Sequence, residues 1–230
     1  MRSQSRLDSV LETFFIHSQN VCFLSELKEE QIADHLCESP SSVAFLGQES
    51  GRVCPEGISF ETRRGCLFIH AGSRVRRKGS KARAGVFIAL GPHLTRLWNT
   101  TGKLLSHSMR HVAIELRLFG HRICVASAYA PLSTSSSRLR SSFCSELASF
   151  ASDSTRSVIV GIDSNSSVGT GRHGLAESVG PHNLPHVNAA GRDFQDFLTT
   201  HSLCLADTFF PKRNELAMTS WIHHRTGQPY

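Results

Sequence analysis

The feature that most constrains the fold is the run VIVGIDSN at residues 158–165, in which branched apolar residues end in two polar ones. Such a run, followed by a serine-rich segment, predicts a short buried strand that leads into a loop. Asp163 and Asn165 are two positions apart, so in extended geometry they project to the same side. A carboxylate beside a neutral donor suits activation of water against a phosphate ester. The structural alternative is an Asx turn, which both residue types also favour.

Composition favours one globular domain over residues 1–230. Hydrophobic residues make up 40% of the chain and charged residues 19%, and no apolar run approaches the roughly 20 residues that span a bilayer. The basic amino terminus is followed by an amphipathic pattern, so we expect no secretory signal. The seven cysteines are scattered and never form Cys-x-x-Cys, which predicts reduced thiols. We therefore expect a soluble intracellular protein that does not contact a membrane.

A cluster of basic residues between Ala71 and Gly85 accounts for the whole net charge of +6. Because no acid lies among them, the cluster predicts an exposed loop between two strands that contacts nucleic acid through phosphate. The alternative is a solvated loop that only aids solubility. The cluster consists of Arg74, Arg76, Arg77, Lys78, Lys81 and Arg83.

Periodicity predicts short strands in the middle of the chain, with helices at intervals between groups of strands. Predicted strands cover residues 21–24, 43–46, 58–60, 66–70, 86–90, 112–118, 123–129, 158–163 and 203–206. Predicted helices cover residues 7–15, 28–36, 135–150 and 191–201, and residues 170–188 form a long loop. This order argues for packed sheets with helices outside, an α/β (α+β) arrangement.

Polar side chains follow three of these strands. Glu26 comes after the strand at 21–24, Tyr129 ends the strand at 123–129, and Asp163 with Asn165 ends the strand described first. If these ends converge, a Glu among them would bind a hard divalent cation, with magnesium the natural choice. Taken singly, Glu26 is equally well explained as a helix-cap carboxylate, and Tyr129 as a core aromatic.

In chain order, these segments resemble the endonuclease/exonuclease/phosphatase superfamily, which includes the apurinic endonucleases and deoxyribonuclease I. The resemblance rests on Phe23-Leu24-Ser25-Glu26, Gly85-Val86-Phe87-Ile88, Ser127-Ala128-Tyr129-Ala130-Pro131 and residues 158–165. Further segments resemble the non-LTR retrotransposon endonuclease and craniofacial development protein 2-like branch: Gly180-Pro181-His182, Asn188-Ala189-Ala190-Gly191, Asp207-Thr208-Phe209-Phe210 and Thr219-Ser220-Trp221. The resemblance implies a four-layer sandwich of two mixed β-sheets flanked by helices.

It also implies roles for individual residues in a DNA endonuclease that uses Mg²⁺, or alternatively Mn²⁺. Glu26 would hold the metal, although Ser25 stands where the family has Gln. Tyr129 would contact the scissile phosphate, Asp163 would activate water and Asn165 would orient it. Thr219 or Ser220 would add a hydrogen bond to phosphate. A genomic DNA substrate would place the protein in the nucleus.

The chain also departs from the family pattern. We expect it to lack the first strand, which ends in Asn, and the C-terminal strands that carry Asp and His. Such a truncated copy would have weakened activity, since general acid–base catalysis is worth about 10²–10⁴-fold. The alternatives are an inactive nucleic-acid-binding or interaction module and a phosphatase or ribonuclease of the same superfamily. A zinc site on His182 and His186 is disfavoured, because the intervening Pro185 prevents helical spacing.

Overall fold

A computed structural model describes residues 14–39, 41–75, 84–171 and 176–211. The chain divides into two compact units, which are described separately. Unit 1 comprises Met1–Tyr129 and Asp153–Asp163, and unit 2 comprises Ala130–Ser152 and Ser164–Tyr230. That both belong to one domain over 1–230 stays a prediction.

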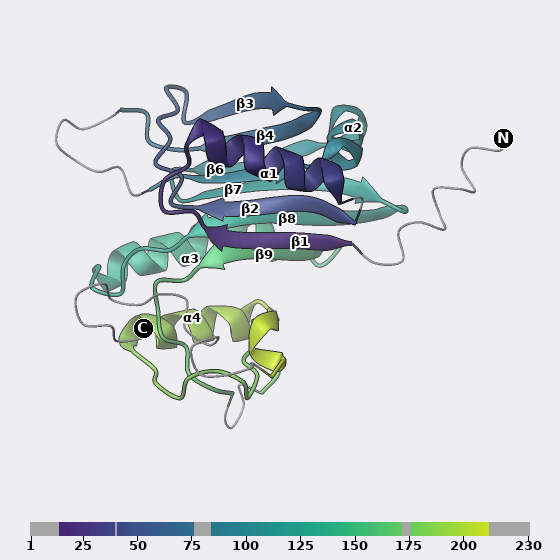
Figure 1. The fold of residues 1–230 in the computed structure, drawn as a ribbon. Helices are drawn as coiled ribbons and strands as arrows, with labels where there is room; N and C mark the ends of the chain where they lie inside the picture. Colours follow the sequence, from purple (N-terminus) through teal and green to yellow (C-terminus); the bar gives the residue numbers. More distant parts are fainter. Residues whose placement is uncertain (1–13, 40, 76–83, 172–175, 212–230) are drawn as a thin grey trace. The chain divides into compact units, whose positions relative to one another are not determined.

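Unit 1 contains two mixed β-sheets (Figure 1). The five-stranded sheet has the order β1-β2-β5-β4-β3, from β1 (Phe15–Asn20), β2 (Ser42–Gln48), β3 (Ile58–Arg63), β4 (Cys66–Ala71) and β5 (Val86–Leu90). The four-stranded sheet has the order β6-β7-β8-β9, from β6 (Lys103–Ser108), β7 (His111–Leu118), β8 (His121–Tyr129) and β9 (Ser157–Asp163). The pairs β1–β2 and β8–β9 are parallel, and the other neighbours are antiparallel.

The main core lies between these sheets. Leu46 and Ile88 of the first sheet belong to the same buried cluster as Ile114 and Val125 of the second. The sheets approach closely at Gly161, where an added Cβ would lie 2.5 Å from Ser18 Oγ and 2.7 Å from Leu46 Cβ. A larger residue there would push β9 away from β1 and β2.

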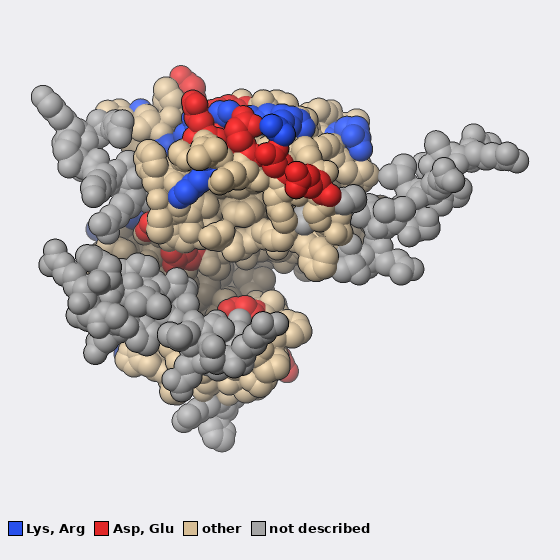
Figure 2. Space-filling view, in the orientation of Figure 1, with Lys and Arg blue, Asp and Glu red and all other residues tan. Residues whose placement is uncertain are grey.

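Helix α1 (Glu26–Glu38) covers the other face of the five-stranded sheet. The Ser25 side chain caps its first turn by accepting from Lys28 N. Ile32, Ala33 and Leu36 face inward, against a second buried cluster that contains Phe68 and Phe87. Figure 2 shows acidic and basic side chains interleaved over this helix, which pairs with arginines of the sheet.

Besides β1, helix α2 and strand β6 of unit 1 were not predicted from the sequence. Helix α2 (Pro92–Thr101) begins with a proline at its first turn, where no amide donor is needed, and packs Leu94, Leu97 and Trp98 against the inter-sheet core. Strand β6 follows it directly and pairs with β7.

Unit 2 contains helices α3 (Ser137–Ala151) and α4 (Ala189–Thr200) and a 3₁₀ turn, η1 (Ala206–Phe209). The two helices contact each other, and Phe143, Leu147, Phe194 and Leu198 are buried. Asn188 caps α4 by accepting from Gly191 N at 2.8 Å. None of the described helices has the length and apolar character that a membrane span requires.

The expected fold class, two mixed β-sheets with helices, is confirmed. Three local predictions are wrong. Residues 21–24 form a loop rather than a strand. The predicted strand at 203–206 is reduced to an isolated bridge at Leu205, and Ala206 begins η1. Phe15 belongs to a strand rather than to a helix. Because β1 ends at Asn20, the expected absence of a first strand that ends in Asn is also wrong. Phe14 has no regular structure, and residues 7–13 of the predicted first helix lie outside the described residues.

Candidate active site at the strand ends

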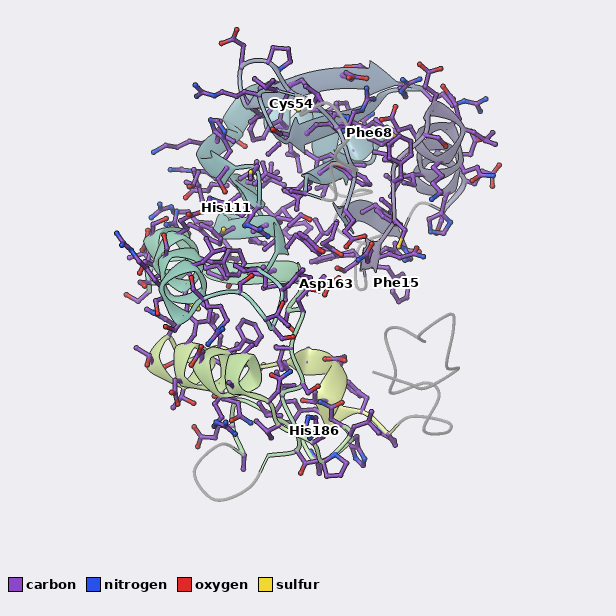
Figure 3. All side chains as sticks on the ribbon, turned by 90° about the vertical axis from the view of Figure 1, so that its left-hand side faces the viewer. Phe15, Cys54, Phe68, His111, Asp163 and His186 are labelled. Atoms are coloured by element: carbon purple, nitrogen blue, oxygen red, sulfur yellow. The ribbon has the colours of Figure 1, made fainter. Side chains whose placement is uncertain are left out.

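Four strands of unit 1, two from each sheet, end at one edge of the sandwich. Asn20 of β1 is in register with Gln48 of β2, and Tyr129 of β8 is in register with Asp163 of β9. Figure 1 shows β1, β2 and β9 pointing the same way, and Figure 3 marks Asp163 at the end of β9. The last residues of parallel neighbours share an edge, so this arrangement collects polar side chains there.

Two hydrogen bonds join the sheets at this edge. Asn20 Nδ2 donates to Asp163 Oδ2 at 2.7 Å, and Tyr129 Oη donates to Oε1 of Glu49, the residue that follows β2. Each bond pairs a carboxylate of one sheet with a neutral donor of the other. The site therefore holds two acidic side chains whose orientation is set by Asn and Tyr.

The buried side chain of Gln48, the residue before Glu49, supports the site. Its Nε2 lies within hydrogen-bonding distance of one acceptor on each of the four strands. These acceptors are Ser18 Oγ at 3.3 Å, Leu46 O at 3.0 Å, Ser127 Oγ at 3.2 Å and Gly161 O at 3.2 Å. This amide thus lies where β1, β2, β8 and β9 meet, and it bonds at most two of them at a time.

Left-handed backbone conformations gather around these residues. Glu49 has a φ of 56°, and in the loop after β1 Cys22 and Phe23 have φ values of 46° and 85°. For residues with a Cβ this region costs roughly 1–2 kcal/mol each. Backbone strain of this kind is commonly found at functional sites.

The site carries the two acidic side chains of Glu49 and Asp163 and is accessible to solvent. Asn20, Glu49 and Asp163 are half-buried, whereas Tyr129 is buried. The pKa of the neighbouring Cys22 thiol is raised, first by partial burial and then by the charge of Glu49. The Cys22 amide donates to Asn20 Oδ1 at 2.9 Å, which fixes the Asn20 side chain from its other end.

The residues present fit a hard divalent cation. Mg²⁺ takes oxygen ligands and is usually held by one or two carboxylates together with substrate phosphate. Glu49 and Asp163 supply two carboxylates, and their neutral partners add no positive charge that would compete with a cation.

The structure brings together only part of the predicted site. Asp163 and Tyr129 lie at the shared edge, as expected. Glu26 does not, because it is the exposed first residue of α1, and the expectation that it ends a strand is wrong. Asn165 belongs to unit 2, where its Nδ2 donates to Ala130 O at 2.9 Å.

Of the predicted contacts to nucleic acid, only Arg74 is described, and it is exposed. The others lie outside the described residues: Arg76, Arg77, Lys78, Lys81, Arg83, Thr219 and Ser220. Their roles stay predictions.

Sequence reasoning missed Asn20 and Glu49. The signal for Glu49 was present, since Gln48-Glu49 comes one residue, Gly47, after the predicted strand at 43–46 and supplies the Gln-Glu pair that the region of Glu26 lacks. The signal for Asn20 was weaker, because β1 is a half-exposed strand with little apolar character.

A second group of ligand-type side chains lies under α1, away from the strand ends. Glu29, Glu61 and His70 approach within metal-binding distance of one another, the one such group of three among the described residues. Arg52 contacts both carboxylates, and Arg63 Nε lies 2.8 Å from Glu29 Oε2. Because these arginines already neutralise the carboxylates, the group is an ion-pair network that attaches α1 to the sheet.

Among solved structures, the fold resembles the endonuclease domain of TRAS1, a telomere-specific non-LTR retrotransposon. The identity is 14%, the TM-score is 0.50, and the match covers 90% of this chain and 76% of that one. Weaker likenesses are to the cytolethal distending toxins of Actinobacillus actinomycetemcomitans, at 13% identity and a TM-score of 0.37, and Haemophilus ducreyi, at 15% and 0.36. Each toxin match covers 65% of this chain and 66% of the other.

No family model and no curated protein matches the chain. The likeness to the TRAS1 domain concerns the fold, and it agrees with the two mixed β-sheets flanked by helices that are expected from the sequence.

Proposed function

We propose that the strand-end site of unit 1 is the active site of a divalent-metal-dependent phosphodiesterase that cleaves nucleic acid, with DNA as its substrate. The observation that carries this proposal is the pair of inter-sheet bonds, Asn20 to Asp163 and Tyr129 to Glu49. They present two oriented carboxylates at a solvent-accessible edge. The fold likeness to a retrotransposon endonuclease domain supports a nucleic acid substrate and the non-LTR branch.

The two carboxylates have separate roles in this proposal. Asp163 accepts a proton from the attacking water, and the amide of Asn20 keeps the carboxylate oriented for that transfer. Glu49, held by the Tyr129 hydroxyl, replaces Glu26 as the residue that would hold the metal. Asn165, two residues beyond Asp163, keeps its predicted role in orienting water.

Mg²⁺, or Mn²⁺ in its place, would stabilise the negative charge that develops on the phosphate. The protein's contribution is to hold both carboxylates at fixed positions. Asn20 and Tyr129 set these positions, because each donates a hydrogen bond to a carboxylate oxygen.

The test is nicking of supercoiled DNA in the presence of Mg²⁺ or EDTA. We expect metal-dependent nicking that falls by about 10²–10⁴-fold in Asp163→Asn, which removes the base and keeps the shape. Glu49→Gln should lose nicking together with metal binding, measured as the Mn²⁺ paramagnetic resonance signal of the bound ion. Glu26→Gln, on the exposed first turn of α1, is the matched control and should nick as well as the wild type.

Two results would overturn the assignment. One is a folded wild-type protein that neither nicks DNA nor binds Mn²⁺. The other is loss of nicking in Glu26→Gln with retention of nicking in Glu49→Gln. This result would assign the metal to Glu26, on the exposed first turn of α1. Salt-dependent DNA binding without metal binding would instead identify the inactive nucleic-acid-binding module.

A further inference from the structure

The loop that joins β1 to α1 holds one aromatic side chain outward beside the candidate active site. Val21 and Leu24 anchor the loop in the core under α1, with 8% and 5% of their surfaces exposed. Phe23, between them, is 56% exposed. The loop therefore buries its aliphatic residues and leaves its largest apolar one in solvent.

Phe23 is also held in place by its backbone. Its amide donates to the carbonyl of Glu49 at 2.8 Å, and its own carbonyl accepts from Lys28 Nζ at 3.0 Å. The same lysine bonds Val21 O at 2.6 Å. These bonds fix Phe23 directly against the residue that carries one of the two site carboxylates.

The fold itself gives no reason for a phenylalanine at this position. A φ of 85° is a conformation that glycine adopts without strain, whereas a residue with a Cβ does not. The exposed ring regains little of this cost through burial. Strained residues that present a side chain next to a site are common where that side chain contacts a ligand.

We propose that the Phe23 ring is a stacking platform for a nucleobase next to the phosphate bound at Glu49 and Asp163. This inference rests on the proposed function, because that function places a nucleotide chain at the site. Every base has a flat π face that stacks on an aromatic ring without regard to sequence. The neighbour of the scissile phosphate in a nucleic acid is always a nucleoside, and its base is the group within reach of a ring on this loop.

The platform defines a substrate class. In an intact duplex the base faces are already stacked, and extruding one costs free energy, least where the base is unpaired or mismatched. A protruding ring therefore favours single strands, mismatches and frayed ends over a paired duplex. The protein should bind an unpaired strand more tightly at this position than the same sequence in a perfect duplex.

The experiment is fluorescence anisotropy of a labelled single-stranded DNA oligonucleotide, with its perfect duplex in parallel, in EDTA so that no cleavage occurs. Phe23→Gly should weaken single-strand binding by roughly 5- to 150-fold, the range measured for loss of one stacked base. Its melting temperature should stay equal or rise, because glycine relieves the strain. Phe23→Trp should retain the affinity.

Phe119 provides a matched control within the chain. It is also a non-glycine residue of positive φ, at 50°, it is 61% exposed, and it lies in the turn between β7 and β8, at the opposite end of β8 from Tyr129. Phe119→Gly should change stability in the same direction but leave the affinity unchanged. Equal affinity of Phe23→Gly and the wild type, or an equal loss in Phe119→Gly, would refute the platform.

Binding without metal and cleavage with metal separate this inference from the proposed function. Metal-dependent nicking with no effect of Phe23→Gly on single-strand affinity would refute the platform and leave the active site standing. Loss of affinity in Phe23→Gly in a protein that never nicks DNA would support a base-binding site and overturn the phosphodiesterase assignment.

Discussion

Replacement of Gln48 by leucine tests whether one buried amide holds the four site strands together. The Gln48 side chain is 2% exposed and its Nε2 has four acceptors within 3.3 Å, but an amide nitrogen has only two hydrogens. At most two full hydrogen bonds are therefore lost, each worth about 0.5–1.5 kcal/mol net. Leucine has a similar size, so little cavity is created. We expect a loss of about 2 kcal/mol, which lowers the melting temperature by roughly 4–8 °C in a chain of this length.

The assay is thermal unfolding followed by circular dichroism, with Gln19→Leu as the control. Gln19 lies next to Asn20 on β1 and is exposed, so its replacement should change the melting temperature by no more than about 1–2 °C. If Gln48→Leu and Gln19→Leu have the same melting temperature, the Gln48 amide contributes nothing to the stability of the junction between the sheets. Its role in supporting the site would then have to be abandoned.

Two further predictions concern the network under α1. Glu29→Gln leaves Arg52 and Arg63 without their buried counter-ion, so we expect the free energy of unfolding in urea to fall by about 3–5 kcal/mol. For the more exposed Glu30→Gln we expect a fall of under about 1 kcal/mol. Equal losses in the two variants would contradict this account. Burial, together with Arg52 and Arg63, lowers the pKa of His70 from 6.5 to about 3, so below pH 6.5 the unfolded chain binds a proton that the folded protein does not. The stability that depends on neutral His70 is complete above pH 6.5 and is lost as the pH falls towards 3. His70→Phe should therefore reduce the fall in the free energy of unfolding over this pH range, measured by urea unfolding. An unchanged pH profile would refute this prediction.

The sequence predicted correctly that Tyr129 and Asp163 each end a strand. β8 is an interior strand whose last six residues are buried, and β9, a half-buried edge strand, pairs with β8 along its whole length. The branched apolar residues of both strands indicate this environment. When neighbouring elements bury a strand, its apolar composition shows that it is buried. Its end, and the polar residue found there, can therefore be located from the sequence.

Glu26 was chosen instead of Glu49 for two physical reasons. The apolar residues at 21–24 are buried as a loop under α1, and periodicity does not distinguish a short buried loop from a short strand. Gly47, in turn, seemed to end the strand that begins at 42. In the structure β2 continues past it, because the Phe87 ring packs where a Cβ would be, at 1.9 Å from that position.

Asn20 was missed because β1 depends on long-range pairing. The segment FIHSQN is half-exposed and has no clear alternation, so its extended form follows from its parallel register with β2. The six residues of β1 contain no feature that identifies β2 as their partner. Polar edge strands of this kind become visible only once the sheet is known.

The two bonds that join the sheets also set when the site can exist. Asn20 and Asp163 are 143 residues apart, and Glu49 and Tyr129 are 80 apart, so neither pair can form within a short fragment of the chain. Contacts of such separation form only after the loops between them have been closed. During synthesis the ribosome must release β9 before Asp163 can meet Asn20. A chain that ends before Asp163 therefore carries no assembled carboxylate pair, and the proposed cleavage would require molecules in which both sheets have folded and docked.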